Sequence, residues 1–336
     1  MALQSIGDLA QGFVLRQQGA HLARETARLT REVSTGRTTD TARHLSGNLV
    51  PLADLERALT LADAHRDVAR IASVDAEIMQ TALGRVAESG EALAQAALTA
   101  DSVGGAIQST VLAQGARAAL STMIGALNTT SAGRALFGGD LADRSPLADT
   151  DTLLQELRTV LTAAPDATTL RSELDAFFDA PGSGFSTVVY RGGQAPAAAF
   201  ALGAGETVAL RIHADDAALR GQIKQAAMLS LLDDPALALG HEDRAALVRD
   251  MGTGLLSGQD GVTRLRAQLG FAEERIAQAR SRIDAEITSL GIARNDLVSV
   301  DIFESATALE QVQSQLETLY TITARTARLN LASFLS

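Results

Sequence analysis

The sequence predicts a mainly α-helical protein in which the N- and C-terminal segments form a long antiparallel coiled-coil bundle, with a small inserted α+β domain. Three observations predict this fold class. Apolar residues recur with a helical period through both ends of the chain. A break rich in Thr, Ser and Gly interrupts the helical pattern of the first half, and a short break interrupts that of the second half at a matching place. Only the middle, about 180–216, changes to the alternation typical of strands.

The first half is expected to hold three helical stretches. In the first, leucines recur every seven residues, which is coiled-coil spacing. The run STGRTTDTARHLSGN (34–48) predicts a break, and Pro51 suits the first turn of the next helix. A third helix is expected around 106–131. Helices that return after the middle of the chain then place the first helix beside the last, and the second beside 262–290.

The middle is expected to be a small mixed domain. Two short helices, DTLLQELRTVL (151–161) and TLRSELDAFFDA (169–180), precede two strand-like runs, FSTVVYRGG and AAFALGAGETVALRIHA. Residues 203–206 supply the turn of a predicted hairpin within the second run.

After the middle, the run MGTGLLSG (251–258) reads as a helix-breaking linker, and a second break is expected between Gly291 and Val300. These patterns predict three domains. Residues 1–47 and 297–336 form a terminal coiled-coil assembly domain, residues 48–145 and 217–296 a helical bundle, and residues 146–216 the insertion.

The terminal helices carry more apolar residues than one partner helix can cover. A two-helix rod shields only one side of each helix, so we expect the rest to pack against other copies of the chain. The candidate assembly interface consists of Leu15, Leu22, Leu29, Leu309, Val312, Leu316, Leu319, Leu329, Leu331 and Phe334.

Composition argues against several classes of function. The chain has 40 acidic and 29 basic residues, a net charge of −11, which disfavours binding to nucleic acid or to an anionic membrane. It contains no cysteine, so disulfides and thiolate chemistry are excluded. The histidines are scattered, and His241-Glu-Asp lacks the second His of a zinc motif, so that a solvated loop histidine is expected there. Asp215-Asp216 and Asp233-Asp234 read as helix caps or as favourable partners of a helix dipole, although such pairs could also bind a cation. We therefore expect no enzymatic activity, catalytic residue, cofactor or metal.

Three separated runs resemble the flagellin family. The turn in SAGRALFGGD (131–140) is similar to that family's G-R-Y-L-F-G-G turn, with Ala135 in place of the usual aromatic. The end of the chain, with its Leu-x-Leu-x-x-Phe-Leu finish, resembles the family's C-terminal helix, and ARLTREVSTGRTTD resembles its N-terminal helix end. The resemblance implies a domain-junction turn made of Gly133, Arg134, Phe137, Gly138 and Gly139. Glycines such as Gly138 and Gly139 suit the positive φ of such turns, and Phe137 is expected to fill the core.

The family's role is structural, so the resemblance implies a component of the extracellular bacterial flagellum, exported by the flagellar type III route without a cleaved signal peptide. The short insertion and the absence of the Gln-Arg-x-Arg-Glu-Leu segment of flagellins favour a hook–filament junction adaptor. The family's acidic stretch after the Gly-Arg turn is also missing, which leaves the connector's detail open. Implied partners are other copies in a ring or tube, a hook-side hook-associated protein, flagellin and an export chaperone.

Two alternatives remain. The chain could be a flagellin, the subunit that builds the filament. It could also be a type III secretion translocator or tip protein, which shares exposed amphipathic ends. The polar faces of its terminal helices are not strongly basic, unlike those of a membrane-surface helix.

Overall fold

The structure, a computed structural model, describes residues 2–103, 106–162, 166–237 and 239–335. The protein is mainly helical, as predicted, and the chain divides into two compact units. Unit 1 combines both ends of the chain, up to Asp63 and from Ala285 onwards. Unit 2 is Ala64–Asp284. The division into an assembly domain, a helical bundle and an insertion, which the sequence predicts, stays a prediction.

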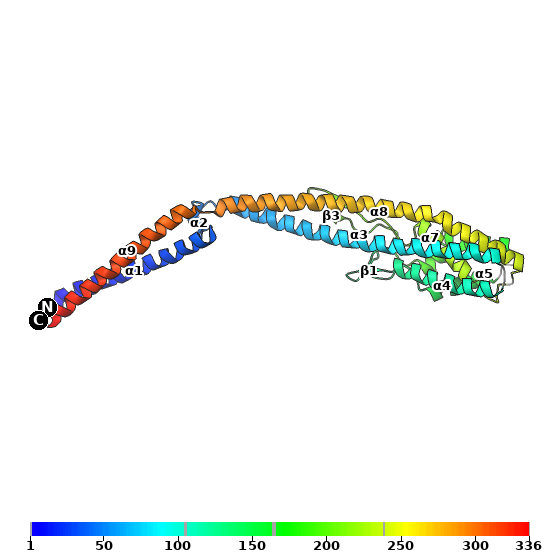
Figure 1. Ribbon diagram of the computed structural model, residues 1–336, viewed down its shortest axis with the longest axis horizontal. Coiled ribbons are helices and arrows are strands. Elements are labelled where there is room, and N and C mark those ends of the chain that lie inside the picture. Colours follow the sequence, from blue (N-terminus) through cyan, green and yellow to red (C-terminus); the bar gives the residue numbers. More distant parts are fainter. Residues whose placement is uncertain (1, 104–105, 163–165, 238, 336) are drawn as a thin grey trace. The chain divides into compact units, whose positions relative to one another are not determined.

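In unit 1 the first helix lies beside the last. Helix α1 (Ala2–Thr35) and helix α9 (Ile302–Leu335) run antiparallel along each other (Figure 1). After α1 the chain passes through a single helical turn, α2 (Thr41–His44), before α3 (Val50–Val103) begins. Pro51 lies in the first turn of α3, where its missing N–H breaks no helical hydrogen bond.

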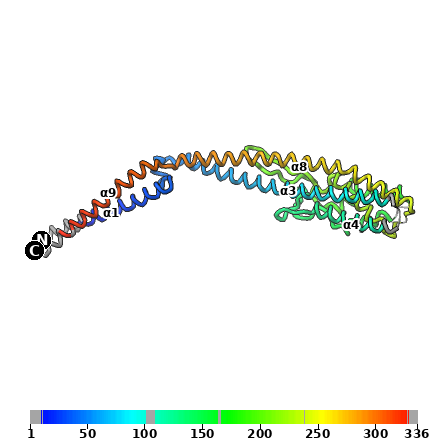
Figure 2. Tube along the Cα trace, viewed as in Figure 1, coloured from blue at the N-terminus to red at the C-terminus, as the bar shows by residue number. Residues whose placement is uncertain are grey.

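Unit 2 is built on the greater part of α3 and of α8 (His241–Val298), which lie side by side (Figure 2); the start of α3 and the end of α8 belong to unit 1. Two glutamines join them, because Gln80 Nε2 donates to the carbonyl of Arg266 at 2.9 Å and Gln259 Nε2 donates to that of Ala87 at 3.1 Å. Helices α4 (Ala106–Leu127) and α7 (Ala217–Ser230) pack against each other in the same unit. The core contains the fully buried side chains of Met79, Leu83, Leu120, Met123 and Leu127.

The rest of unit 2 is the small mixed region. It holds α5 (Thr150–Leu161) and α6 (Ala167–Asp179), whose first turns are capped by the carboxylates of Asp149 and Asp166. Two antiparallel hairpins flank them along the chain. Strand β1 (Thr130–Ser131) pairs with β2 (Arg134–Ala135), and β3 (Phe200–Ala201) pairs with β4 (Thr207–Val208). The hairpin predicted around residues 203–206 is therefore confirmed.

The first predicted strand of the middle is wrong. Within FSTVVYRGG, residues Phe185–Val189 form a π-helical turn, η1. Phe185 and Val189 are both buried, and the helical turn places them on one face. The carbonyl of Ser183 accepts hydrogen bonds from the Ser186 and Thr187 hydroxyls at 3.0 and 2.8 Å, which stabilises the turn locally. Packing thus overrides the strand preference of Val and Thr.

The predicted linker at 251–258 is also wrong, because these residues lie inside α8. The glycines do not break the helix; they let neighbouring helices come close. A β-carbon on Gly252 would lie 3.2 Å from the β-carbon of Ala97 on α3, and one on Gly254 would lie 2.8 Å from Gln225 Nε2 on α7. Close packing compensates for the roughly 1 kcal/mol that glycine costs in a helix.

Gln222 of α7 shows the same close packing at one layer of unit 2. Its side chain is completely buried between Gly90 of α3 and Gly258 of α8. The amide nitrogen donates to the carbonyl of Leu255 at 3.0 Å. A side chain at Gly90 or Gly258 would overlap this amide, so three helices meet where two of them lack a β-carbon.

The second predicted break is shorter than expected. Helix α8 continues through Gly291 to Val298, and only residues 299–301 separate it from α9. Asp301 ends the break, since its Oδ1 accepts hydrogen bonds from the N–H groups of Phe303 and Glu304 at 2.8 and 3.1 Å and so caps α9. A single glycine between strong helix formers does not end a helix.

Candidate assembly interface

The predicted leucine stripes of α1 and α9 lie in unit 1, where these two helices pack. Leu29 is buried, with 4% of its surface exposed, and Leu319 is buried on α9. The other stripe residues with described side chains are half-buried: Leu15, Leu22, Leu309, Val312 and Leu316. The side chains of Leu329, Leu331 and Phe334 lie outside the described part of the chain. The pair therefore covers its stripes only in part.

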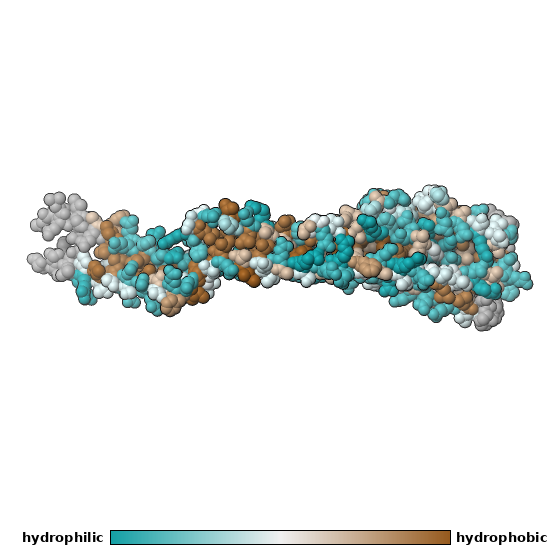
Figure 3. Space-filling model, turned by 90° about the horizontal axis from the view of Figure 1, so that it is seen from above, coloured by the Kyte–Doolittle hydropathy of each residue, from teal (hydrophilic) through white to brown (hydrophobic). Residues whose placement is uncertain are grey.

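Apolar side chains remain on the surface of the α1/α9 pair. Phe13 is 62% exposed, and Val14, Tyr320 and Ile322 are each about half exposed or more. Figure 3 shows hydrophobic side chains, in brown, spread among polar ones over the described part of unit 1. A groove of about 420 Å³ runs between the two helices, lined by Gln18, His21 and Leu22 on one side and by Gln315, Leu319 and Ile322 on the other. A helix pair with this surface has apolar area left for further helices.

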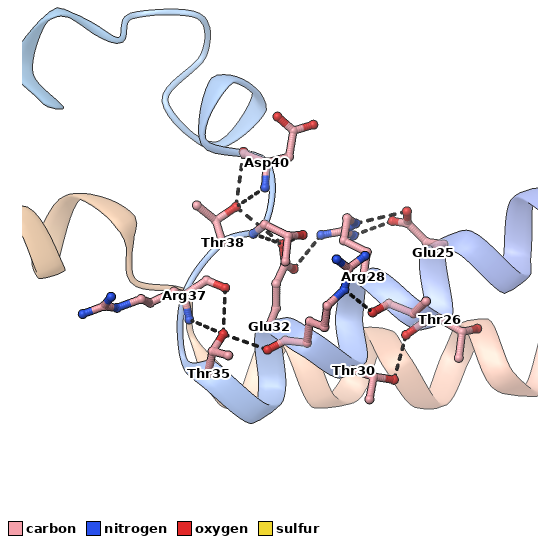
Figure 4. Close-up of polar contacts among 12 residues, drawn as sticks. Glu25, Thr26, Arg28, Thr30, Glu32, Thr35, Arg37, Thr38 and Asp40 are labelled. Carbon is pink, nitrogen blue, oxygen red and sulfur yellow. Dashed lines mark hydrogen bonds and ion pairs between the residues drawn. The ribbon is translucent and has the colours of Figure 1, made fainter. Parts of the chain in front are cut away.

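The C-terminal end of α1 is held by a buried carboxylate. Glu32, only 3% exposed, accepts a hydrogen bond from Arg28 Nη1 at 2.6 Å (Figure 4). It also accepts one from the backbone N–H of Thr39 at 3.0 Å. Arg28 also pairs with Glu25 one turn earlier. Burial alone would raise the pKa of Glu32, but the Thr39 and Arg28 hydrogen bonds outweigh it, so that the pKa lies below its usual value.

The two connectors of unit 1 pair with each other. The N–H of Thr38 donates to the carbonyl of Val298 at 2.9 Å, and the N–H of Val300 donates to the carbonyl of Gly36 at 3.1 Å. Gly36 follows the last residue of α1 with φ +66°, a conformation that a side chain would strain. Its N–H donates to the carbonyl of Glu32 at 2.8 Å, which closes the helix end. The segment after α1 is thus bonded to the segment before α9.

The predicted domain-junction turn lies in unit 2 just after α4. Gly133 has φ +79° and forms the β1–β2 turn, and Arg134 is exposed. Phe137 is completely buried, as expected. Gly139 has the positive φ that was expected, +62°, whereas Gly138 does not. Gly138 is needed for space instead, because a β-carbon there would lie 2.6 Å from the carbonyl oxygen of Leu141.

This turn is hydrogen-bonded to both ends of the segment 190–216. The N–H of Gly193 donates to the carbonyl of Gly138 at 2.8 Å, and the N–H of Asp140 donates to the carbonyl of Ala195 at 2.9 Å. The N–H of Ala214 donates to the carbonyl of Phe137 at 3.0 Å. A β-carbon on Gly139 would lie 2.6 Å from the Ala195 oxygen, so the loop approaches as closely as a glycine allows.

No group of three or more His, Asp or Glu side chains among the described residues is arranged to hold a metal ion. Asp216 precedes α7, and its Oδ2 accepts the His213 N–H at 2.9 Å; Asp234 pairs with Arg158. His241 is exposed as predicted, although it is the first residue of α8 and not part of a loop. Within the described ranges, every helix is too short or too polar to span a bilayer.

Comparison with known proteins assigns the C-terminal part. Residues 258–335, which include most of α8 and all of α9, match the family described as bacterial flagellin C-terminal helical region. The chain thus resembles flagellins over this C-terminal region. Its fold is similar to a solved structure from Vibrio parahaemolyticus, provisionally assigned as a flagellar hook-associated protein. The identity is 13% and the TM-score 0.53, over 74% of this chain and 96% of that chain. No curated protein sequence matches the chain.

Two features of α1 were not predicted from the sequence. Gly19 of α1 faces Leu319 of α9, and a β-carbon on it would lie 3.4 Å from Leu319 Cδ2. Glu32 was not singled out, although its position holds a signal. An acidic residue in the last turn of a helix opposes the helix dipole, so it needs a specific partner. Glu32 has such partners in Arg28 and Thr39.

Proposed function

We propose that this protein belongs to the flagellin family and is the adaptor at the hook–filament junction, where it assembles through α1 and α9. The observation that carries the proposal is the incompletely covered apolar surface of the α1/α9 pair, on residues such as Phe13 and Ile322. The likeness of its fold to a protein provisionally assigned as flagellar hook-associated, over 96% of that chain, supports this role. The residues of the candidate interface would then contact neighbouring subunits.

The proposed partners follow from this role. Copies of the chain would form a ring or tube through the terminal helices, with a hook-side hook-associated protein on one side and flagellin on the other. An export chaperone would cover the apolar terminal helices before assembly, because such surface promotes aggregation in a free chain. The proposed location is outside the cell, on the flagellum.

Deletion of the gene tests the adaptor role. We expect the mutant cells to export flagellin but shed it into the medium, because the hook would lack the surface on which the filament grows. Immunogold labelling of the protein should mark one short band at the hook end of intact flagella. Filaments attached normally in the deletion strain, or label along the whole filament, would contradict an adaptor.

A filament subunit is the second candidate, and the match of residues 258–335 to the flagellin C-terminal region favours it. The two roles differ in self-assembly. A filament subunit must bind copies of itself without limit, which requires two mutually complementary faces. An adaptor must present different surfaces to two different neighbours. Purified protein, seeded or salted out, should therefore form at most short assemblies, and long regular filaments would establish the flagellin role instead.

A further inference from the structure

Glu32 is an unusual residue for the place that it occupies. Its carboxylate is buried in the last turn of α1, where the helix dipole disfavours negative charge. An unpaired buried carboxylate would be strongly destabilising, so the side chain depends on its hydrogen-bond partners. These partners show what the residue contacts.

Most of the partners belong to the connector after α1. Glu32 Oε1 accepts hydrogen bonds from the backbone N–H and the hydroxyl of Thr39, at 3.0 and 3.1 Å, and a longer one of 3.4 Å from the hydroxyl of Thr38. The other oxygen, Oε2, accepts from Arg28 Nη1. Arg28 is in turn held by Glu25, which makes no hydrogen bond to the connector in the described part of the chain (Figure 4).

The same connector is bonded on its other side to the residues that precede α9. Thr38, whose hydroxyl reaches Glu32, donates its N–H to Val298, and Gly36 accepts from Val300. Arg37 adds a side-chain bond, since its Nη2 donates to Asn295 Oδ1 at 2.5 Å. Asp301 then caps α9. Thr38 therefore links the carboxylate of Glu32 directly to the residues that precede α9.

We propose that Glu32 is a positioning residue: it holds the connector Gly36–Asp40 on the end of α1 and thereby fixes the stagger of α1 against α9. A helix turns by about 100° for each residue. A connector that moved by one residue would therefore rotate the leucine stripe of α1 away from that of α9. Gly19 and Leu319, which meet across the pair, lie at similar distances along the chain from this junction. This role concerns the monomer and does not depend on where the protein assembles.

Hydrogen exchange of the purified protein tests the first half of the proposal. Glu32→Gln keeps the shape of the side chain but removes its charge, so the amide of Thr39 should exchange about tenfold faster, as expected when a hydrogen bond to a charged acceptor is replaced by a weaker one to a neutral amide. Glu25→Gln is the matched control, because it removes a charge from the same Arg28 without touching the connector. Circular dichroism establishes that both variants remain helical.

A conservative series separates positioning from general stability. Thr39→Val removes one hydroxyl bond to the carboxylate and should give a smaller acceleration at residue 39, and Thr39→Ser, which keeps the hydroxyl, should restore the original rate. Equal exchange rates in Glu32→Gln and in the unmodified protein would overturn the proposal. So would the same acceleration in Glu25→Gln, because the effect would then belong to Arg28 alone.

Distance measurements test the stagger itself. The chain has no cysteine, so spin labels can be attached through Gln18→Cys and Thr318→Cys, two positions that line the same groove. We expect one narrow distance distribution in this background and with Glu25→Gln, and a shifted or broadened one with Glu32→Gln. An unchanged distribution in Glu32→Gln would show that α1 and α9 keep their stagger without the carboxylate.

Discussion

Gly19 and Leu319 meet across the α1/α9 pair: a β-carbon on Gly19 would lie 3.4 Å from Leu319 Cδ2, at the close end of ordinary van der Waals contact. The leucine of one helix thus packs against the bare backbone of the other. Space for a larger side chain is lacking at this point, whereas Gly12, one heptad earlier in α1, has no atom within 4 Å of its β-carbon position.

Larger residues at position 19 should therefore weaken the pair. Gly19→Leu would push Leu319 away and expose apolar surface, so we expect faster hydrogen exchange along both helices and poor incorporation into flagella. Gly19→Ala should be tolerated, because alanine gains about 1 kcal/mol in helix propensity over glycine. Gly12→Leu is the matched control. If Gly19→Leu behaves like Gly12→Leu, the two helices do not pack as described.

Charged residues in the α9 stripe should abolish assembly without unfolding unit 2. Leu316→Asp combined with Leu319→Asp places two carboxylates where apolar contacts are made, and both positions belong to unit 1. The thermal transition of unit 2 should persist, while flagella lose the protein. Gln313→Asp, at an exposed position of the same helix, adds a comparable charge and should leave incorporation intact. Normal incorporation of the double variant would show that the assembly interface does not include this stripe.

Alanine at Gly139 should destabilise unit 2. Its φ of +62° is a strained conformation for alanine, and the new methyl group would meet the carbonyl oxygen of Ala195. We expect a loss of about 2 kcal/mol in the free energy of unfolding, measured by urea denaturation. Gly133→Asn provides the comparison, since asparagine tolerates positive φ and no atom lies within 4 Å there. Equal stabilities of the two variants would argue against this account of the turn.

The link between α6 and α7 should weaken at both extremes of pH. Lys224, the chain's only lysine, bonds to Asp175 and Asp179, each at 2.7 Å. Burial would raise the pKa of Asp179, but Lys224 and Arg220 hold it below the usual 3.8. Burial would lower the pKa of Lys224, but the two carboxylates hold it above the usual 10.5.

The signs of these shifts set the pH windows. A lowered carboxyl pKa stabilises the fold above pH 3.8, and this contribution is lost as the pH falls through the folded value. A raised lysine pKa stabilises the fold below pH 10.5 and is lost as the pH rises through the folded value. The melting temperature of unit 2 should fall in both windows. Lys224→Met should flatten the alkaline fall, and an unchanged profile would show that the link contributes nothing.

Much of the fold could be predicted because periodicity reports burial. The stripe through Leu22 and Leu29 predicted a helix that packs on the last one, and the glycines around Gly203 predicted the second hairpin. Packing between distant segments could not be predicted in this way. The glycines of 251–258 read as breaks because the residues that fill the space beside them, on α3 and α7, are distant in sequence.

The candidate site likewise has features that follow from periodicity and features that depend on contacts between distant segments. The leucine positions follow from spacing, and the roles assigned to them stay predictions. The hydrogen bonding of Glu32 depends on the path of the connector after α1, which folds back so that Thr39 lies beside the end of that helix. Hydrophobic periodicity in the sequence carries no information about the path of such a connector.

The packing of Gln222 between Gly90 and Gly258 implies that these three positions mutate as one unit. A methyl group at Gly90 alone would overlap the glutamine amide, and Gln222→Ala alone would leave a cavity and the two glycines without a filler. When both changes are made, the methyl group at position 90 would occupy part of the space that Gln222→Ala leaves. The double variant should therefore be more stable than the sum of the two single effects predicts. Homologous chains should therefore change their residues at these positions jointly, and a library that varies them one at a time would find few folded members.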